Sequence, residues 1–152
     1  MKIRTLTATI LLGMTVTASA VAAPHGTDFK DLMRKELDAW STMDTEKAAP
    51  FYAQGPNNVL FELTTLKCNG WAEFGADVKK AFADMTSIQF TIHDDVQVHQ
   101  QGHLAWGTAT VRDEVVTKAG QHEAIEARWT VIWEKQGKNW LIVHEHFSAP
   151  AT

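Results

Sequence analysis

Two carboxylic acids in the second half of the chain, Asp94 and Glu145, have the chemistry of a general acid or base. Both lie in stretches that alternate between apolar and polar residues, which predicts β-strands with successive side chains on opposite faces. Our strand pairing puts both carboxyls on the more apolar face, where burial raises a carboxyl pKa and favours proton transfer near neutral pH. The same pairing puts Arg112 diagonally opposite Glu145, so a structural ion pair is the interpretation that we favour over catalysis.

The same face carries the side chains that we expect to bind a ligand. Trp106 and Trp129 flank the few polar side chains of this face. They offer large apolar surfaces with a hydrogen-bonding indole N–H. Tyr52, which is expected on a short helix, closes the mouth of the resulting hollow. The expected ligand-binding residues are therefore Tyr52, Trp106, Thr110, Arg112, Trp129 and Glu145.

The opposite face of the sheet is mixed in character and too apolar for simple exposure to water, so we expect a subunit interface there. Its expected members are Arg128, Trp140, His144 and His146. The two histidines share a strand face, and such a pair is able to hold zinc or copper. A metal needs a third ligand, and none falls in register on the neighbouring strands. We therefore expect interface or hydrogen-bonding histidines, with no metal and no cofactor.

Positioning these side chains requires a particular order of elements. The helical spacing of apolar residues predicts helices over 29–43 and 71–84, with a shorter helix over 45–53. Alternating runs between short glycine-bearing turns predict strands. The expected strands are 59–66, 87–99, 103–116, 122–135 and 139–147. The last four form an antiparallel meander, and a curved sheet with three helices covering its concave face is the natural α+β arrangement.

The N-terminal residues 1–22 have the features of a secretory signal peptide. Lys2 and Arg4 precede a short run of apolar residues, which is too short to span a bilayer comfortably. Small residues fit cleavage after Ala20, Ala22 or Ala23. We therefore expect a periplasmic or secreted protein whose residues 23–152 form a single domain.

The charge of the chain narrows its possible partners. The 152 residues carry a formal net charge of −4 at pH 7, and removal of the signal peptide takes away only positive charges. This acidity argues against binding to nucleic acid and against binding to an anionic membrane surface. The single cysteine, Cys68, excludes an intrachain disulfide.

The C-terminal stretch carries the family signal of the chain. It runs Trp129-Thr130-Val131-Ile132-Trp133-Glu134-Lys135, then Gly137, then Trp140-Leu141-Ile142-Val143-His144-Glu145-His146-Phe147-Ser148-Ala149-Pro150. Together with the helix–helix–strand–helix–meander order, this stretch resembles the SnoaL-like branch of the nuclear transport factor 2-like superfamily. It is also similar to the association domain of calcium/calmodulin-dependent kinase II, whose last strand has a similar Val-His-x-His-x-Ser run.

The resemblance extends over about residues 29–150 and implies a cone-shaped α+β fold with a pocket between sheet and helices. It also implies homodimers or larger rings that form through the sheet. The fold hosts isomerases, polyketide cyclases, epoxide hydrolases, dehydratases and non-catalytic scaffolds, so it leaves the function open. We expect a domain that binds a small, largely apolar molecule in its pocket. An acid–base enzyme that uses the same pocket and a non-catalytic dimerisation scaffold are the alternatives.

Overall fold

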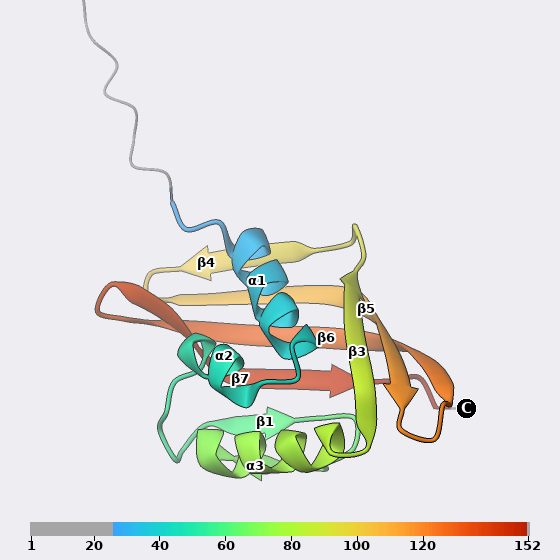
Figure 1. Ribbon diagram of the computed structural model, residues 1–152. Helices are drawn as coiled ribbons and strands as arrows, with labels where there is room; N and C mark the ends of the chain where they lie inside the picture. Colours follow the sequence, from blue (N-terminus) through green and yellow to red (C-terminus); the bar gives the residue numbers. More distant parts are fainter. Residues whose placement is uncertain (1–25, 152) are drawn as a thin grey trace, which may run out of the picture.

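The computed structural model describes residues 26–151, and the expected signal peptide over residues 1–22 lies outside them. The helices are α1 (Phe29–Ser41), α2 (Thr45–Ala48), the 3-10 turn η1 (Ala49–Phe51) and α3 (Gly70–Phe82). The strands are β1 (Val59–Phe61), β2 (Cys68–Asn69), β3 (Met85–Ile92), β4 (Gln97–Gln101), β5 (Leu104–Thr117), β6 (His122–Gln136) and β7 (Asn139–Ser148). Helices α1, α2 and α3 lie on one side of the sheet (Figure 1). We call the side of the sheet away from the helices the outer face.

The strands form one sheet with the order β2-β1-β7-β6-β5-β3, and β4 pairs with the part of β5 that β3 leaves free. Strands β5, β6 and β7 form the antiparallel meander that the sequence predicts. Strand β1 runs parallel to β7, so the sheet is mixed and not wholly antiparallel. The sheet curves strongly and brings β3 round to the side of α1 (Figure 1). This arrangement is the expected cone-shaped α+β fold.

Local sequence sets the ends of the helices. The side chain of Asp28 caps α1 and accepts a hydrogen bond of 3.1 Å from the backbone N–H of Asp31. The expected helix over 45–53 is shorter, because Pro50 has no N–H to continue the helical ladder and forces a 3-10 turn after α2. Within residues 26–151, no helix combines the length and the apolar character that crossing a membrane requires.

The register between β5 and β6 differs by one residue from the predicted pairing. Trp129 lies opposite Ala109 instead of Thr110, because the turn between the strands is one residue shorter than predicted. The backbone N–H of Thr117 closes this turn with a hydrogen bond to the carbonyl oxygen of Gln121. A one-residue slip moves every side chain of a strand to the other face. The inward-facing residues of β5 are therefore Ala105, Gly107, Ala109, Val111 and Asp113.

The pairing of β7 with β6 deviates twice from the predicted register, by one residue each time. Together the two shifts return the second half of β7 to its predicted face. Gln136 pairs with Asn139, so the turn is one residue shorter than predicted. A bulge between Ile132 and Trp133 then shifts the pairing by one more residue. The first half of β7 consequently has its two faces exchanged, whereas the second half keeps the predicted orientation. The buried residues of β7 are Trp140, Ile142, Glu145 and Phe147.

The core between α1 and the sheet depends on a close approach at Gly107. A Cβ atom at this position would lie 2.9 Å from the Met33 sulfur and 3.0 Å from the Trp133 ring. Trp133 also packs against Phe29, with ring centroids 5.2 Å apart. Burying large side chains of this kind contributes roughly 1.5–3 kcal/mol each. The packing of α1 on these rings fixes the position of the residues that follow along the helix.

Candidate functional site

Three separate elements bring a tyrosine and two glutamates into contact in the interior of the fold. Glu36 comes from α1, Tyr52 directly follows η1, and Glu145 comes from β7. The Tyr52 hydroxyl oxygen lies 2.6 Å from Oε1 of Glu36 and 2.5 Å from Oε2 of Glu145. All three side chains are buried, with exposures of 0% for Glu36, 2% for Tyr52 and 1% for Glu145. We call these three residues the carboxyl–tyrosine cluster.

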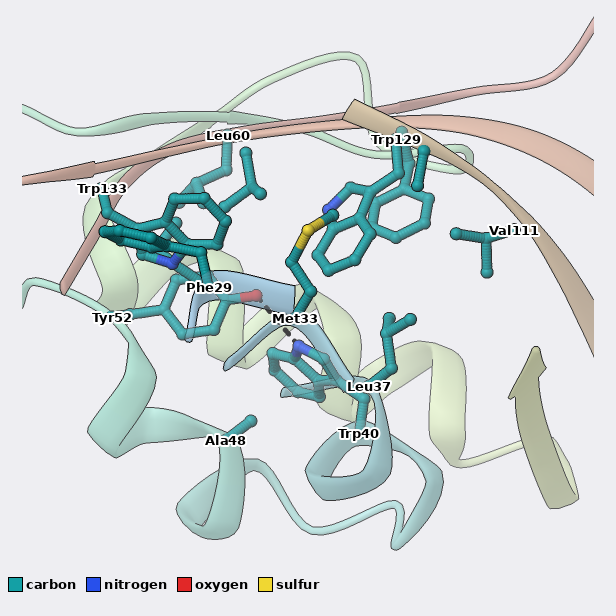
Figure 2. Packing of buried hydrophobic residues seen from close by; sticks show 14 of the residues in the cluster. Phe29, Met33, Leu37, Trp40, Ala48, Tyr52, Leu60, Val111, Trp129 and Trp133 are labelled. Atoms are coloured by element: carbon teal, nitrogen blue, oxygen red, sulfur yellow. Dashed lines mark hydrogen bonds between the residues drawn. The ribbon is translucent and has the colours of Figure 1, made fainter. Parts of the chain in front are cut away.

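Two tryptophan indoles donate hydrogen bonds to this cluster, whereas the buried Oε2 of Glu36 has no partner among the described residues. Trp40 donates a hydrogen bond of 2.9 Å from Nε1 to the Tyr52 oxygen, drawn as a dashed line in Figure 2. Trp129 donates a hydrogen bond of 2.7 Å from Nε1 to Oε1 of Glu145. Donors therefore face both oxygens of Glu145, and such donors stabilise the carboxylate form.

The protonation of the cluster follows from its geometry. The Tyr52 hydroxyl has one proton to donate, so one of the two carboxyls must itself carry a proton and donate it to the tyrosine oxygen. Burial, followed by repulsion from Glu145, raises the pKa of Glu36 well above its ordinary value. Burial also raises the pKa of Glu145, but only to about 7, because hydrogen bonds from Tyr52 and Trp129 oppose the effect. We therefore assign the proton to Glu36, and Tyr52 donates to Glu145.

A cavity of about 260 Å³ lies beside the cluster, and Glu145 forms part of its wall. Its lining comes from α1, α3 and β3, from the loop over 62–65, from Cys68 of β2 and from the ends of β5, β6 and β7. Most of this lining is apolar. The larger apolar side chains are Leu37, Trp40, Leu63, Phe74, Val78, Phe82, Met85, Ile88, Phe90, Val115, Ile125 and Phe147. The cavity therefore presents a mostly apolar wall that includes the buried carboxyl group of Glu145.

Two further acidic residues line the cavity, and each has a buried carboxyl oxygen that lacks a hydrogen-bond donor among the described residues. Asp113 is 4% exposed, and its Oδ1 has no partner among the described residues. The same holds for the buried Oε1 of Glu62, whose side chain is partly exposed. Burial raises the pKa of Asp113 to about 7. Burial, followed by repulsion from Glu145, raises the pKa of Glu62 well above its ordinary value.

The chemistry available in this site is the binding and transfer of protons. Glu145 and Asp113 both have a pKa raised to about 7, so each is able to accept or release a proton near neutral pH. Within residues 26–151, no group of three or more His, Cys, Asp or Glu side chains is arranged to hold a metal ion.

Comparison with known families agrees with this architecture. A profile of the SnoaL-like domain matches residues 30–152, which is most of the chain. The chain belongs to the SnoaL-like domain family. The resemblance drawn from the C-terminal stretch is thereby confirmed. No curated protein sequence matches the chain.

Solved structures share the fold of this SnoaL-like domain at low sequence identity. A nuclear transport factor 2-like superfamily protein from Salmonella enterica has a TM-score of 0.76 at 17% identity, covering 82% of this chain and 90% of that chain. A candidate calcium/calmodulin-dependent protein kinase II association domain from Xanthomonas campestris has a TM-score of 0.72 at 20% identity, covering 92% and 98%. A candidate dehydratase from Streptomyces avermitilis has a TM-score of 0.70 at 16% identity, covering 82% and 98%.

Three of the six expected ligand-binding residues of this SnoaL-like domain lie together. Trp129 and Glu145 face the helices, as the strand pairing predicts, and Tyr52 contacts Glu145. Of these three, only Glu145 lines the cavity. Tyr52 and Trp129 lie outside the lining and donate hydrogen bonds to the carboxyl group of Glu145. Tyr52 is therefore part of the buried cluster, and its expected position at the mouth of the pocket is wrong.

The other three, Trp106, Thr110 and Arg112, lie on the outer face, so their expected place in the pocket is wrong. The slip of β5 by one residue turns all three away from the helices. Arg112 donates a hydrogen bond of 2.9 Å to Glu126 on that face. The expected ion pair with Glu145 therefore does not form.

Asp94 also lies away from the cavity. The predicted strand over 87–99 breaks into β3 and β4, and Asp94 is exposed in the turn between them. The next residue, Asp95, holds this turn against β5, because its Oδ2 accepts a hydrogen bond of 2.9 Å from the Thr110 hydroxyl. The expected place of Asp94 on the concave face is therefore wrong.

Three of the four expected interface residues lie on the outer face. Arg128 and His146 are exposed there, and Nδ1 of His144 lies 2.7 Å from the carbonyl oxygen of Val59. The fourth, Trp140, is 8% exposed and packs in the core against the start of α1. The shorter turn before β7 exchanges the faces at this position, so the expected place of Trp140 on the outer face is wrong.

Sequence reasoning missed Glu36, Glu62 and Asp113, although the sequence contains a signal for Glu36 and Asp113. Glu36 lies three residues after Met33 and four before Trp40, so helical spacing alone places it on the buried side of α1. Asp113 continues an alternation of small apolar residues with larger polar ones along β5. The small residues are Ala105, Gly107, Ala109 and Val111. If the faces of β5 are assigned from this alternation and not from the length of the turn, Asp113 falls on the inward face.

Proposed function

We propose that this SnoaL-like domain binds a small, largely apolar molecule in the cavity beside Glu145. The observation that carries the proposal is the cavity itself, which has a volume of about 260 Å³ and a wall that is mostly apolar. Concave apolar sites with a few convergent polar groups are the usual anatomy of small-molecule sites. Buried carboxyls at the wall supply the groups that orient a ligand.

A cavity-filling substitution tests this proposal. Ala81 on α3 lines the cavity, so Ala81→Trp fills the space with an indole. Ala76 lies on the exposed side of the same helix, so Ala76→Trp is the matched control. We expect uncharged naphthylmethanol to bind saturably to the wild type and to Ala76→Trp, as measured by calorimetry and by NMR shifts of α3 amides. Absence of saturable binding, or binding that survives Ala81→Trp, contradicts the proposal.

A second candidate function is acid–base catalysis in the same cavity. It is supported by two carboxyls, Glu145 and Asp113, whose pKa values are both raised to about 7. A candidate dehydratase among the structural relatives makes removal of water from a bound alcohol the first reaction to assay. We expect Asp113→Asn to abolish any such turnover without unfolding the protein. Glu114→Gln on the outer face makes the same change of charge and should leave turnover intact.

We also propose that two copies of the domain associate through the outer face. Leu104 and Trp106 are 40% and 38% exposed on this face, and a structural relative described as an association domain supports self-assembly. We expect Trp106→Lys to convert the dimer into a monomer in light scattering. Leu66→Lys replaces a residue that is 92% exposed in the loop before β2 and is the control. A dimer that survives Trp106→Lys contradicts this interface.

The composition of residues 1–22 supports the further proposal that the protein works in the periplasm or after secretion. N-terminal sequencing of the protein from a periplasmic extract should find a mature chain that begins after Ala20, Ala22 or Ala23. A full-length chain that stays in the cytoplasmic fraction contradicts export.

A further inference from the structure

The charged groups that line the cavity are all acidic. Glu62, Asp113 and Glu145 lie along its wall, and three further acids complete the set. These are Asp77, Asp84 and Glu123. Among the described residues, no lysine, arginine or histidine lines the cavity. Outside the lining, the Lys80 ammonium lies 2.8 Å from a carboxyl oxygen of Asp77. The other five acids have no basic side chain beside them in the lining.

Two carboxyl oxygens in this wall also lack donors among the described residues. Oδ1 of Asp113 and Oε1 of Glu62 are both buried without a hydrogen-bond partner among the described residues. Buried polar atoms in folded proteins nearly always have a partner, and an acceptor without one is costly. Asp113 is 4% exposed, so bulk water does not hydrate it freely. A ligand in the cavity is therefore the natural source of the missing donors.

The charge of this wall decides which donors fit. A carboxylate ligand would add a further negative charge beside several acids, which is unfavourable at low dielectric. An alcohol supplies one neutral donor. A protonated amine supplies three donors and a positive charge, and its charge-assisted hydrogen bonds are the stronger kind. The apolar wall takes the hydrocarbon part of the same molecule.

We propose that the cavity selects small apolar molecules that carry a protonated amine, which the carboxyl oxygens of Asp113 and Glu62 bind. This inference rests on the proposed binding of a small molecule in the same cavity. It adds the sign of charge and the chemical class of the ligand. The ammonium group would supply the hydrogen bonds that both oxygens lack and neutralise part of the acidic wall.

Three ligands of one shape test the inference: naphthylmethylamine, naphthylmethanol and naphthoate, which are cationic, neutral and anionic near neutral pH. We expect calorimetry to show the amine binding at least about tenfold more tightly than the alcohol, and naphthoate not binding. Asp113→Asn should remove most of the advantage of the amine while leaving the affinity for the alcohol within about threefold. Glu114→Gln should change neither affinity.

The outcomes separate this inference from the proposal on which it rests. If the alcohol binds in the cavity and the amine binds no more tightly, the charge selection is wrong and the binding site stands. If the amine keeps its advantage in Asp113→Asn, the assignment of the acceptor is wrong. If neither ligand binds, both proposals fail. Unfolding curves of Asp113→Asn show that the variant is folded before its affinity is compared.

Discussion

The hydroxyl group of Tyr52 connects two acidic side chains that come from different parts of the chain. It accepts a hydrogen bond from Trp40 and contacts both Glu36 and Glu145 within 2.6 Å. A buried carboxyl without such partners costs several kcal/mol. The tyrosine therefore allows two glutamates to share one apolar interior, provided that one of them stays protonated.

The first prediction concerns removal of this hydroxyl. We expect Tyr52→Phe to lower the free energy of unfolding by about 2 kcal/mol or more, because Trp40 loses its acceptor and Glu145 loses a donor. The pKa of Glu145 should rise further, since the bond from Tyr52 lowers it in the wild type. Urea unfolding and NMR titration of the carboxyl measure the two effects.

Glu36→Gln is the matched control for this prediction. An amide N–H takes the place of the carboxyl proton, so we expect a change of less than about 1 kcal/mol. A loss as large as that of Tyr52→Phe would mean that Glu36 is ionised, which contradicts our assignment of the proton.

The sequence predicts part of this site at the residue level. Trp129 and Glu145 fall on the correct face because a strand alternates strictly. The partners of Glu145 were not predictable in the same way. Glu36 and Tyr52 are distant from it along the chain, and their contact depends on how α1 and η1 pack on the sheet. A pairing argument within the meander carries no information about those helices.

At the level of elements, turn length accounts for the wrongly predicted faces of β5 and of the first half of β7. A difference of one residue in the turn before β6 turned Arg112 outward and Asp113 inward. The order of the main helices and strands follows from hydrophobic periodicity and was predicted, except that β2 was missed and the strand over 87–99 breaks into β3 and β4. The register depends on turn geometry and on bulges such as the one at Ile132 and Trp133, which a count of residues does not reveal.

The second prediction concerns the junction of β2 and α3. Gly70 has a φ of +74°, and a Cβ atom there would lie 2.9 Å from both the carbonyl oxygen of Gly55 and Cα of Pro56. We expect Gly70→Ala to lower the free energy of unfolding by about 2 kcal/mol or more, because the left-handed conformation and the backbone contact both penalise a side chain. Denaturant unfolding measures the loss.

A substitution in the same helix provides the comparison. At Gly75 a Cβ atom would meet the Trp71 ring at 3.6 Å, which is an ordinary contact. Gly75→Ala should therefore leave stability unchanged or raise it by about 0.5–1 kcal/mol, as expected inside a helix. Equal effects at the two glycines would contradict the special role of Gly70.

At the level of the whole molecule, the acidic groups in and around the cavity link folding to pH. In the unfolded chain a carboxyl ionises with a pKa of about 4. In the folded protein Asp113 and Glu145 have pKa values raised to about 7. Between these values the folded state holds more protons than the unfolded state. Raising the pH through this range therefore lowers stability.

The third prediction is the direction of this dependence. We expect the free energy of unfolding to fall between about pH 5 and about pH 7, by up to about 1.4 kcal/mol per pH unit for each such group. Asp95 and Glu126 have lowered pKa values, so their effect appears at lower pH. Melting curves recorded at several pH values across this range measure the dependence. Glu145→Gln should make the free energy of unfolding depend less on pH. A stability that rises over this interval contradicts the raised pKa values of Asp113 and Glu145.

The hydrogen bond between Trp129 and Glu145 has a consequence for spectroscopy. Ionisation of Glu145 creates a full negative charge next to an indole N–H that lies 2.7 Å from the carboxyl oxygen. Indole fluorescence is sensitive to the local electric field, and Trp129 is shielded from aqueous quenchers because it is 1% exposed. The contribution of Trp129 to the intrinsic emission therefore reports the charge state of Glu145 without any attached label.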